Sequence, residues 1–345
     1  MVTQSDQLDL QKRTVSYDMY DMSVRQLVDM VESKVIDIAP DYQRHFVWDN
    51  DRESELIESV FLGIPVPSLY MATNPDATWE VVDGVQRLST LIHFCGIDHA
   101  RLAVGRPAPL RLSGLRKLET FNGSTFDELP KTVQLSFTLR PLRITALNDK
   151  SDNYVRYDLF ERLNTGGVKL HAQEIRNCVI SGAFSETIKS LSKSENFRAV
   201  VTLPNNEVRE ATYQEMVLRF FAFFDNYLEF DHDVEDFLTE YMQTHSRSGP
   251  SMSALAHFEP TMIHLRERLP AGISRNNRKT TPINLYEGVA VGTALAMATG
   301  QPLNWGCFPD IVGSNALKQF TTAATNSRPM VRGRIETVRD ALIHG

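Results

Sequence analysis

The stretch Val81–Ile92 constrains the fold of this chain more than any other part of the sequence. An apolar, strand-like run ends at Asp83-Gly84, and the polar pair Gln86-Arg87 then opens an apolar, helix-like segment. A strand, a tight turn and a helix in this order direct backbone N–H groups and the positive end of a helix dipole at one point, which suits phosphate. An Asp-Gly pair is also an ordinary turn signal, so a plain turn remains the alternative.

The side chains at this turn carry chemistry that phosphate binding needs. Gly84 permits close approach of the backbone, and the Arg87 guanidinium can fork onto two phosphate oxygens. The Asp83 carboxylate can orient a water molecule or hold Mg²⁺ through water. Phosphoryl transfer depends on positioned cations and donors more than on a covalent nucleophile, so these residue types fit it.

Composition limits the class of protein. A chain of 345 residues with 42% hydrophobic content can bury one large core or two modest ones. The formal net charge of −7 argues against a surface coated in positive charge for indiscriminate DNA binding, although it permits a local basic groove. The three cysteines, Cys95, Cys178 and Cys307, are far apart and form no C-x-x-C pair, which favours buried thiols in a reducing compartment.

Nothing in the sequence predicts export or membrane insertion. The N-terminus is polar and mixed in charge, unlike a signal peptide. The longest apolar stretch, residues 289–298, is too short to cross a bilayer and is interrupted by glycine. We therefore expect a cytoplasmic protein.

Hydrophobic periodicity divides the chain in two. A polar lead-in over 1–20 precedes an alternation of helix and strand, with helices expected at 24–33, 49–62 and 86–94 and strands at 35–38, 65–71, 78–82 and 139–146. From about 153 the period is helical, with helices expected at 155–163, 172–181, 185–192, 213–228, 234–244, 253–268, 285–298 and 332–343. A polar run at 148–153 marks a domain boundary, which gives domains 1–150 and 151–345.

Several features have a structural explanation. The apolar positions Met216, Val217, Phe220, Phe221 and Phe224 share one expected helix and indicate core rather than a cofactor site. Asp233 and its acidic neighbours are better explained as the start of a helix than as metal ligands. The sequence has no Walker A loop. Its His and Cys residues are not clustered, so we predict no resident metal site.

One basic stretch remains open. Residues 101–117 carry five Lys or Arg and no acid among them. A surface loop is the default interpretation, and a nucleic-acid contact is the alternative.

Three further segments, 40–48, 56–67 and 159–170, accompany 83–87 in a fixed order. This set resembles the family named for the N-terminal region of GmrSD-type restriction enzymes, whose fold is similar to ParB and sulfiredoxin. The likeness continues through 126–130, 173–177 and 326–335. It implies an α+β fold: a small ParB/sulfiredoxin-like mixed α/β domain followed by a mainly α-helical domain that completes the pocket and docks partners.

The resemblance implies nucleotide binding and NTP hydrolysis in the regulatory or sensor subunit of a restriction-type antiphage defence system. Asp83, Gln86 and Arg87 would be catalytic, and Gly84 would bind phosphate with them. The remaining nucleotide-binding residues implied are Tyr42, Gln43, Arg44 and Asn164, of which the first three form a second wall and the last closes the pocket. GTP or ATP with Mg²⁺ would be the ligand. DNA, or a separately encoded nuclease or ATPase subunit, would be the partner, and the resemblance is compatible with an oligomer.

The sequence departs from the family at one position of the central motif. The usual Asp-Gly-Gln-Gln-Arg has Val85 as its third residue here. If the missing glutamine contacts nucleotide or water, activity is weakened or altered; if that position only packs, nothing changes.

Alternatives remain for the chain and for single residues. The larger relatives append an H-N-H nuclease that this sequence lacks, so a regulatory subunit is favoured over a ParB-like nuclease; a non-catalytic module that binds DNA phosphates, including modified ones, is the other alternative. Arg44 could pair with a nearby aspartate, and Tyr42 and Trp48 could be core aromatics. We interpret Glu174 and Arg176 as a buried structural pair.

Overall fold

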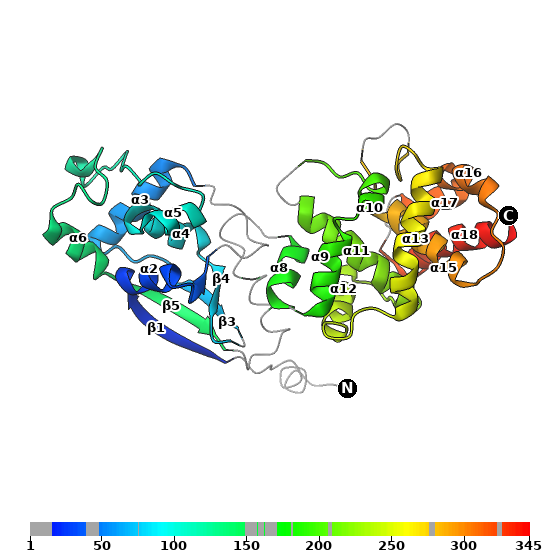
Figure 1. Ribbon diagram of the computed structural model, residues 1–345, viewed down its shortest axis with the longest axis horizontal. Helices are drawn as coiled ribbons and strands as arrows, with labels where there is room; N and C mark the ends of the chain where they lie inside the picture. Colours follow the sequence, from blue (N-terminus) through cyan, green and yellow to red (C-terminus); the bar gives the residue numbers. More distant parts are fainter. Residues whose placement is uncertain are drawn as a thin grey trace, which may run out of the picture. The chain divides into compact units, whose positions relative to one another are not determined.

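The computed structural model describes residues 16–38, 48–74, 76–148, 157, 162, 171–180, 182–205, 209–275, 280–322 and 326–345. The chain divides into two compact units, Met1–Leu170 and His171–Gly345 (Figure 1). Most of 149–170 lies outside the described residues, so the domain boundary near residue 150 stays a prediction. The expected helix at 155–163 also lies largely outside them.

Unit 1 is built on a mixed five-stranded sheet. Its strands are β1 (Tyr17–Ser23), β2 (Ile36–Asp37), β3 (Leu69–Thr73), β4 (Trp79–Asp83) and β5 (Pro141–Leu147). They lie in the order β1-β5-β3-β4-β2. The pairs β1/β5 and β3/β4 are antiparallel, whereas β3/β5 and β2/β4 are parallel.

The helices of unit 1 lie to one side of this sheet (Figure 1). They are α2 (Val24–Glu32), α3 (Asn50–Leu62), α4 (Val85–Cys95), α5 (Asp98–Ala103) and α6 (Lys131–Thr138). Apolar side chains of the helices and the sheet, among them Leu27, Ile57, Met71, Leu91 and Ile144, form one buried core.

Local capping explains where two of these helices begin. Ser23 accepts a hydrogen bond from the backbone of Gln26, and the Gln26 side chain accepts one from the backbone of Ser23. Asp49 caps α3 by accepting from Arg52 N–H (2.9 Å). The first helix begins where the sequence predicts, and the second begins one residue later, at Asn50.

All regular secondary structure in the described residues of unit 2 is helical. Its helices are α8 (Ala172–Val179), α9 (Ala183–Leu191), α10 (Glu195–Val200), α11 (Arg209–Asn226), α12 (Val234–Thr244), α13 (Met252–Arg268), α14 (Ile283–Tyr286), a π-helical turn η2 (Glu287–Val291), α15 (Gly292–Ala298), α16 (Phe308–Gly313), α17 (Asn315–Thr321) and α18 (Arg328–His344). Phe220 and Phe221 of α11 pack against Phe258 of α13, which confirms that the apolar face of α11 is core.

The structure confirms the α+β class and corrects some elements. Residues 17–20, expected as part of a polar lead-in, begin the edge strand β1. Five short helices, α5, α6, α10, α16 and α17, have no counterpart in the prediction because six to eight residues give too few turns for a periodic signal. None of the described helices combines the length and apolar character that crossing a membrane requires.

Two glycines allow the C-terminal helix to pack closely in unit 2. A Cβ added to Gly288 would lie 2.9 Å from the carbonyl oxygen of Arg334, and one added to Gly292 would lie 2.6 Å from that of Ile335. Both glycines therefore mark a place where η2 and α15 approach the backbone of α18.

We predict that Gly292→Ala lowers the free energy of unfolding by about 1–3 kcal/mol, because the added methyl group overpacks this contact. Gly313→Ala is the matched control: it also adds a methyl group to a helical glycine, but nothing lies within 4 Å of the new Cβ. The control should change stability by at most about 1 kcal/mol. Urea unfolding measures both, and equal effects would contradict the close-packing argument.

Candidate functional site

The turn between β4 and α4 has the geometry that the sequence predicts. Gly84 has φ 101° and ψ 13°, a left-handed conformation, and it occupies the N-cap of α4 without a side-chain cap. A Cβ at this position would lie 2.3 Å from Cδ2 of Leu69 on β3. Both the dihedral angle and the close approach therefore require glycine.

Arg87 ties the turn to the strand beside it. Its Nη2 donates to Oδ2 of Asp83 (2.6 Å), and its Nη1 donates to the carbonyl oxygens of Ser68 (3.1 Å) and Pro67. One guanidinium thus joins the end of β4 to the entry of β3. The structure brings two of the predicted site residues, Asp83 and Arg87, together at this turn.

The Arg87 guanidinium keeps donors beyond those that these contacts use. The three bonds use at most three of the five N–H donors of a guanidinium. The side chain of Asp83 is 39% exposed, and that of Arg87 is 14% exposed. The pair therefore faces solvent at its acidic end while its basic end is partly enclosed.

Gln86 connects the turn to a buried polar chain. Its Oε1 accepts from the backbone N–H of Trp48 (3.2 Å), and the carbonyl oxygen of Trp48 accepts from Nη2 of Arg106 (2.8 Å). Nε of Arg106 lies 3.9 Å from Oε1 of Glu53. The donor at Trp48 fixes the orientation of the Gln86 amide, because only the amide oxygen can accept.

Glu53 and His93 end this chain as a buried pair. Oε2 of Glu53 lies 2.5 Å from Nδ1 of His93, and Nε2 of His93 lies 3.0 Å from the carbonyl oxygen of Ala108. A carbonyl only accepts, so Nε2 carries a hydrogen. One further proton then has to lie between Nδ1 and the carboxylate.

Val85 packs against the core of unit 1 as a partly buried side chain. Of the two alternatives for the departure from the family motif, this observation favours the packing one.

The remaining predicted binding residues, Tyr42, Gln43, Arg44 and Asn164, lie outside the described residues. Their roles stay predictions. In the sequence, the first three come shortly before Trp48, the residue whose N–H binds Gln86.

Sequence reasoning missed the polar chain behind the turn. Trp48 acts through its backbone, which leaves no signal in the sequence. Glu53 and His93 lie on the buried sides of α3 and α4, and an ionisable residue at a core-facing position is a detectable signal.

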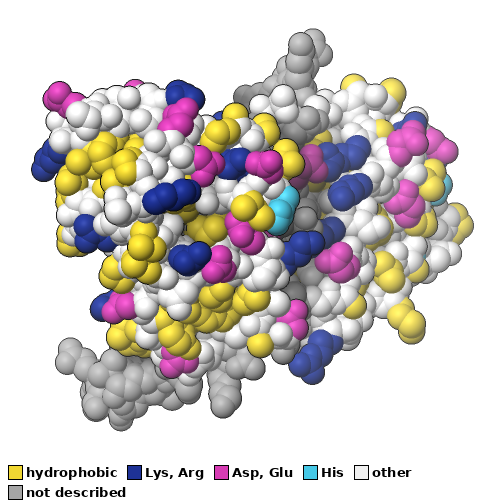
Figure 2. Space-filling view, turned by 60° about the vertical axis from the view of Figure 1, so that its left-hand side comes forward, with side chains coloured by type: hydrophobic (Ala, Val, Ile, Leu, Met, Phe, Trp, Pro, Cys, Tyr) yellow, Lys and Arg dark blue, Asp and Glu magenta, His cyan; other side chains and the backbone are white. Residues whose placement is uncertain are grey.

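The basic stretch divides into anchored and exposed parts. Arg101 donates to Asp98 and to the carbonyl oxygen of Gly96, and Arg106 belongs to the chain above. Arg111 forks onto Glu128 at the surface, with both side chains more than half exposed. Over the face of unit 1 that Figure 2 presents, basic and acidic side chains are interspersed with hydrophobic ones.

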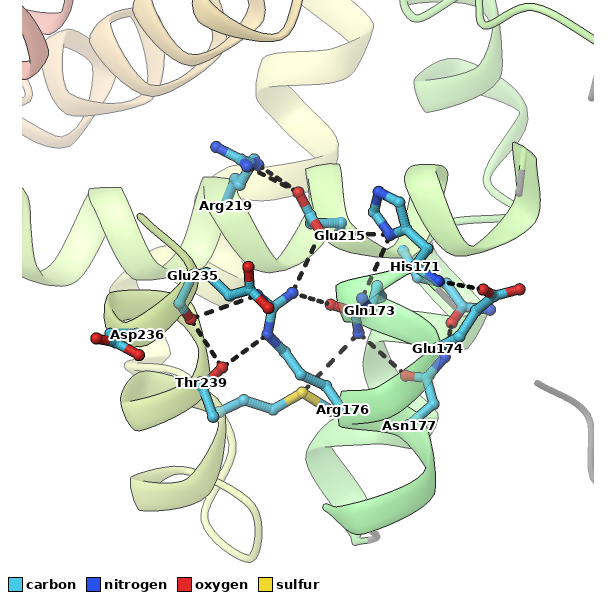
Figure 3. Close-up of polar contacts among 12 residues, drawn as sticks. His171, Gln173, Glu174, Arg176, Asn177, Glu215, Arg219, Glu235, Asp236 and Thr239 are labelled. Atoms are coloured by element: carbon cyan, nitrogen blue, oxygen red, sulfur yellow. Dashed lines mark hydrogen bonds and ion pairs between the residues drawn. The ribbon is translucent and has the colours of Figure 1, made fainter. Parts of the chain in front are cut away.

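A second family segment, residues 173–177, lies on α8 in unit 2 and enters a buried network (Figure 3). Arg176, 1% exposed, donates to Oγ1 of Thr239 (3.0 Å), Oε1 of Gln173 (3.1 Å) and Oε2 of Glu215 (3.2 Å). The ion pair of Arg176 therefore runs to α11. Our interpretation of Glu174 and Arg176 as a pair is wrong: Glu174 caps its own helix, accepting from the N–H of His171 (2.5 Å).

Charge pairing extends from Glu215 to the C-terminal helix. Arg219 donates to Oε1 of Glu215 (2.7 Å) and to Oε1 of Glu287 (2.6 Å). Glu287, in the π-helical turn, also pairs with Arg334 of α18, and both are fully buried. Alternating charges thus link α8, α11, η2 and α18.

The pKa of Glu215 reflects this pairing. Burial alone raises the pKa of a carboxyl group, but Arg219, Arg176 and His171 outweigh it and lower the pKa of Glu215 from 4.5 to about 2. Burial lowers the pKa of Arg219, but Glu215 and Glu287 outweigh this effect and raise the pKa above its ordinary value.

The described residues offer no preformed metal cluster: no three His, Cys, Asp or Glu side chains among them are placed to hold an ion together. Asp233 is the N-cap of α12 and accepts from the backbones of Glu235 and Asp236, which confirms the helix-start interpretation. The exposed carboxylate of Asp83 fits Mg²⁺ only as one ligand among phosphate oxygens and water.

We predict that Glu215 makes unit 2 sensitive to acid. The folded-state pKa is lower than the unfolded one, so its stabilisation is complete above pH 4.5 and is lost as pH falls toward 2. The loss should be about 3 kcal/mol, measured by urea unfolding across this range. Glu215→Gln should lower the free energy of unfolding at pH 7 and make it depend less on pH in the acid range. Glu128→Gln, at an exposed arginine pair, should leave the acid dependence unchanged. An unchanged slope in Glu215→Gln would contradict this.

Comparison with known proteins adds one finding. The family model described as GmrSD restriction endonuclease, N-terminal domain, matches residues 24–181. The match contains the Asp83–Arg87 turn and extends through α8 into unit 2. No protein of curated function matches the chain significantly.

Proposed function

We propose that the protein is a nucleotide-binding, NTP-hydrolysing regulatory or sensor subunit of a restriction-type antiphage defence system. The match of residues 24–181 to the GmrSD restriction endonuclease N-terminal domain supports the proposed role in defence. The proposed site is the turn Asp83–Arg87. Its proposed partners are DNA or a separately encoded nuclease or ATPase.

The observation that carries the proposal is the junction itself. Gly84 lets a ligand approach the backbone closely at the start of α4, where no side chain caps the helix. Asp83 and Arg87 meet within 2.6 Å at the same place and remain partly exposed. A helix N-terminus flanked by a guanidinium is a favourable environment for phosphate oxygens.

Each side chain would have a separate role. Arg87, held by two carbonyl oxygens and Asp83, would present its remaining donors to phosphate oxygens as charge develops in the transition state. Gln86, whose amide is oriented by the N–H of Trp48, would orient the attacking water. Tyr42, Gln43, Arg44 and Asn164 would complete the pocket.

Hydrolysis then needs little covalent chemistry from the protein. The oxygen of water forms a bond to the terminal phosphorus as the bridging P–O bond breaks, which gives NDP and inorganic phosphate. Asp83 would hold Mg²⁺ through water, and the ion would neutralise charge on the phosphate oxygens. Val85 packs in the core, so the proposal does not rely on the position where the motif departs.

The DNA-binding alternative receives less support from side-chain contacts. Two of the arginines in the basic stretch are anchored within the unit, and Arg328, Arg332 and Arg339 near the C-terminus also bind oxygens of the chain. Arg116 and Lys117 remain exposed. A DNA contact there would weaken steeply with salt and would be reduced in the variant Arg116→Ala/Lys117→Ala.

We predict that GTP or ATP with Mg²⁺ raises the melting temperature of the full chain and is hydrolysed. Asp83→Asn retains a hydrogen-bond acceptor for Arg87 but removes the charge, so it should keep the fold and reduce phosphate release about tenfold or more. Asp98→Asn is the matched control, because Asp98 also pairs with a nearby arginine, Arg101, but follows the opposite end of α4.

The outcomes separate the alternatives. Binding without phosphate release would refute hydrolysis and leave a nucleotide sensor. No binding of either nucleotide, with DNA retarded on a gel, would replace the proposal by the DNA-binding alternative, and nicking of plasmid by the chain alone would indicate a nuclease.

A further inference from the structure

Unit 2 contains a cavity of about 330 Å³ near the end of α13. It is bordered by the turn after α13 and by helices α16 and α17. The residues that line it are Arg268, Leu269, Pro270, Ala271, Gly272, Ser274, Arg275, Val312, Gly313 and Lys318. Three of these described lining residues are cationic, and none is acidic.

Arg275 has an unsatisfied donor at this cavity. It donates through Nε to the carbonyl oxygen of Val312 (2.8 Å) and through Nη1 to Oγ1 of Thr321 (2.7 Å). Its Nη2 is buried and has no hydrogen-bond partner among the described residues. Burial lowers the pKa of Arg275, and no carboxylate offsets the effect. A buried charged donor without an acceptor is unfavourable, so the site favours an occupant that accepts.

The positive charge at the cavity is only partly compensated. Arg268 pairs with Glu267 (3.1 Å), and its guanidinium lies 4.1 Å from the ring centroid of Trp305. Over the part of the chain that is described, Arg275 and Lys318 have no such acidic partner. Two unit charges therefore remain at the cavity.

Helix ends do not account for both charges. The carbonyl end of α16 explains the contact of Arg275 with Val312, because cations are stabilised there. That contact uses Nε and leaves Nη2 unsatisfied. A water molecule would satisfy this donor but would leave the two charges uncompensated. An anion would satisfy the donor and also compensate the charges.

We propose that this cavity binds the phosphoryl group of a small molecule. A phosphate dianion matches two cations better than a carboxylate does, and its oxygens can accept from Nη2 of Arg275, Nζ of Lys318 and the hydroxyl of Ser274. The cavity volume is at the lower end for small-molecule sites, so the rest of the ligand is small. This site lies in unit 2, goes beyond the proposed function and does not depend on it.

The test is calorimetric titration of the full chain with inorganic phosphate, pyrophosphate and acetate. We expect inorganic phosphate or pyrophosphate to bind with half-saturation below about 1 mM and acetate to bind far more weakly. Tighter binding of pyrophosphate would indicate a phosphoanhydride, and preference for inorganic phosphate would indicate the free ion or a monoester. Quenching or enhancement of Trp305 fluorescence, absent in Trp305→Phe, would locate the event next to Arg268.

Two substitutions should each weaken phosphate binding about tenfold or more: Arg275→Gln and Lys318→Gln. Lys318→Gln keeps the test valid if Arg275→Gln does not fold. Arg266→Gln is the control, since Arg266 lies on α13 but pairs with Glu195 and does not line the cavity. Equal binding in Lys318→Gln and wild type, or no binding by wild type, would overturn the proposal.

Controls separate this site from the turn in unit 1. Asp83→Asn should leave the Trp305 fluorescence response to phosphate unchanged, because that response reports on the cavity alone, and Lys318→Gln should leave NTP hydrolysis unchanged. Failure of one proposal would therefore be distinguishable from failure of the other.

Discussion

A charge removed from water has to meet an opposite charge, and much of unit 2 is arranged around that requirement. Glu215 contacts Arg176 and Arg219, and Glu287 contacts Arg219 and Arg334. Removing one member would leave its partner charged and buried. The network therefore specifies how α8, α11, η2 and α18 pack, since hydrophobic contacts alone are less selective about register.

The same requirement organises the turn of unit 1 on a smaller scale. Arg87 satisfies two carbonyl oxygens and Asp83, and Arg106 lies between Trp48 and Glu53. These contacts orient the side chains of the Asp83–Arg87 turn without any ligand. Rigid placement of donors is what electrostatic stabilisation of a transition state requires, because no reorganisation then accompanies the reaction.

Much of the fold could be predicted from local signals in the sequence. Features that depend on contacts between distant residues could not. Ser23 and Asp49 announce their helices because a cap acts within three residues. The strand β1 was not predicted, because its first residues are exposed and show no apolar alternation. It forms a strand by pairing with β5, more than 100 residues later in the chain. The candidate site follows the same division, since the order of β4, Gly84 and α4 is local, whereas the contact of Gln86 with Trp48 joins residues 38 apart.

The family match and the compact units end at different places. The match reaches residue 181, but α8 packs with the helices of unit 2, where Arg176 neutralises Glu215. A segment that the family match covers together with the first unit is therefore a structural component of the second. A truncation at the end of the match, after residue 181, would separate that arginine from its carboxylate, whereas a truncation at the border of the units, after Leu170, would keep α8 with the helices whose charge it neutralises.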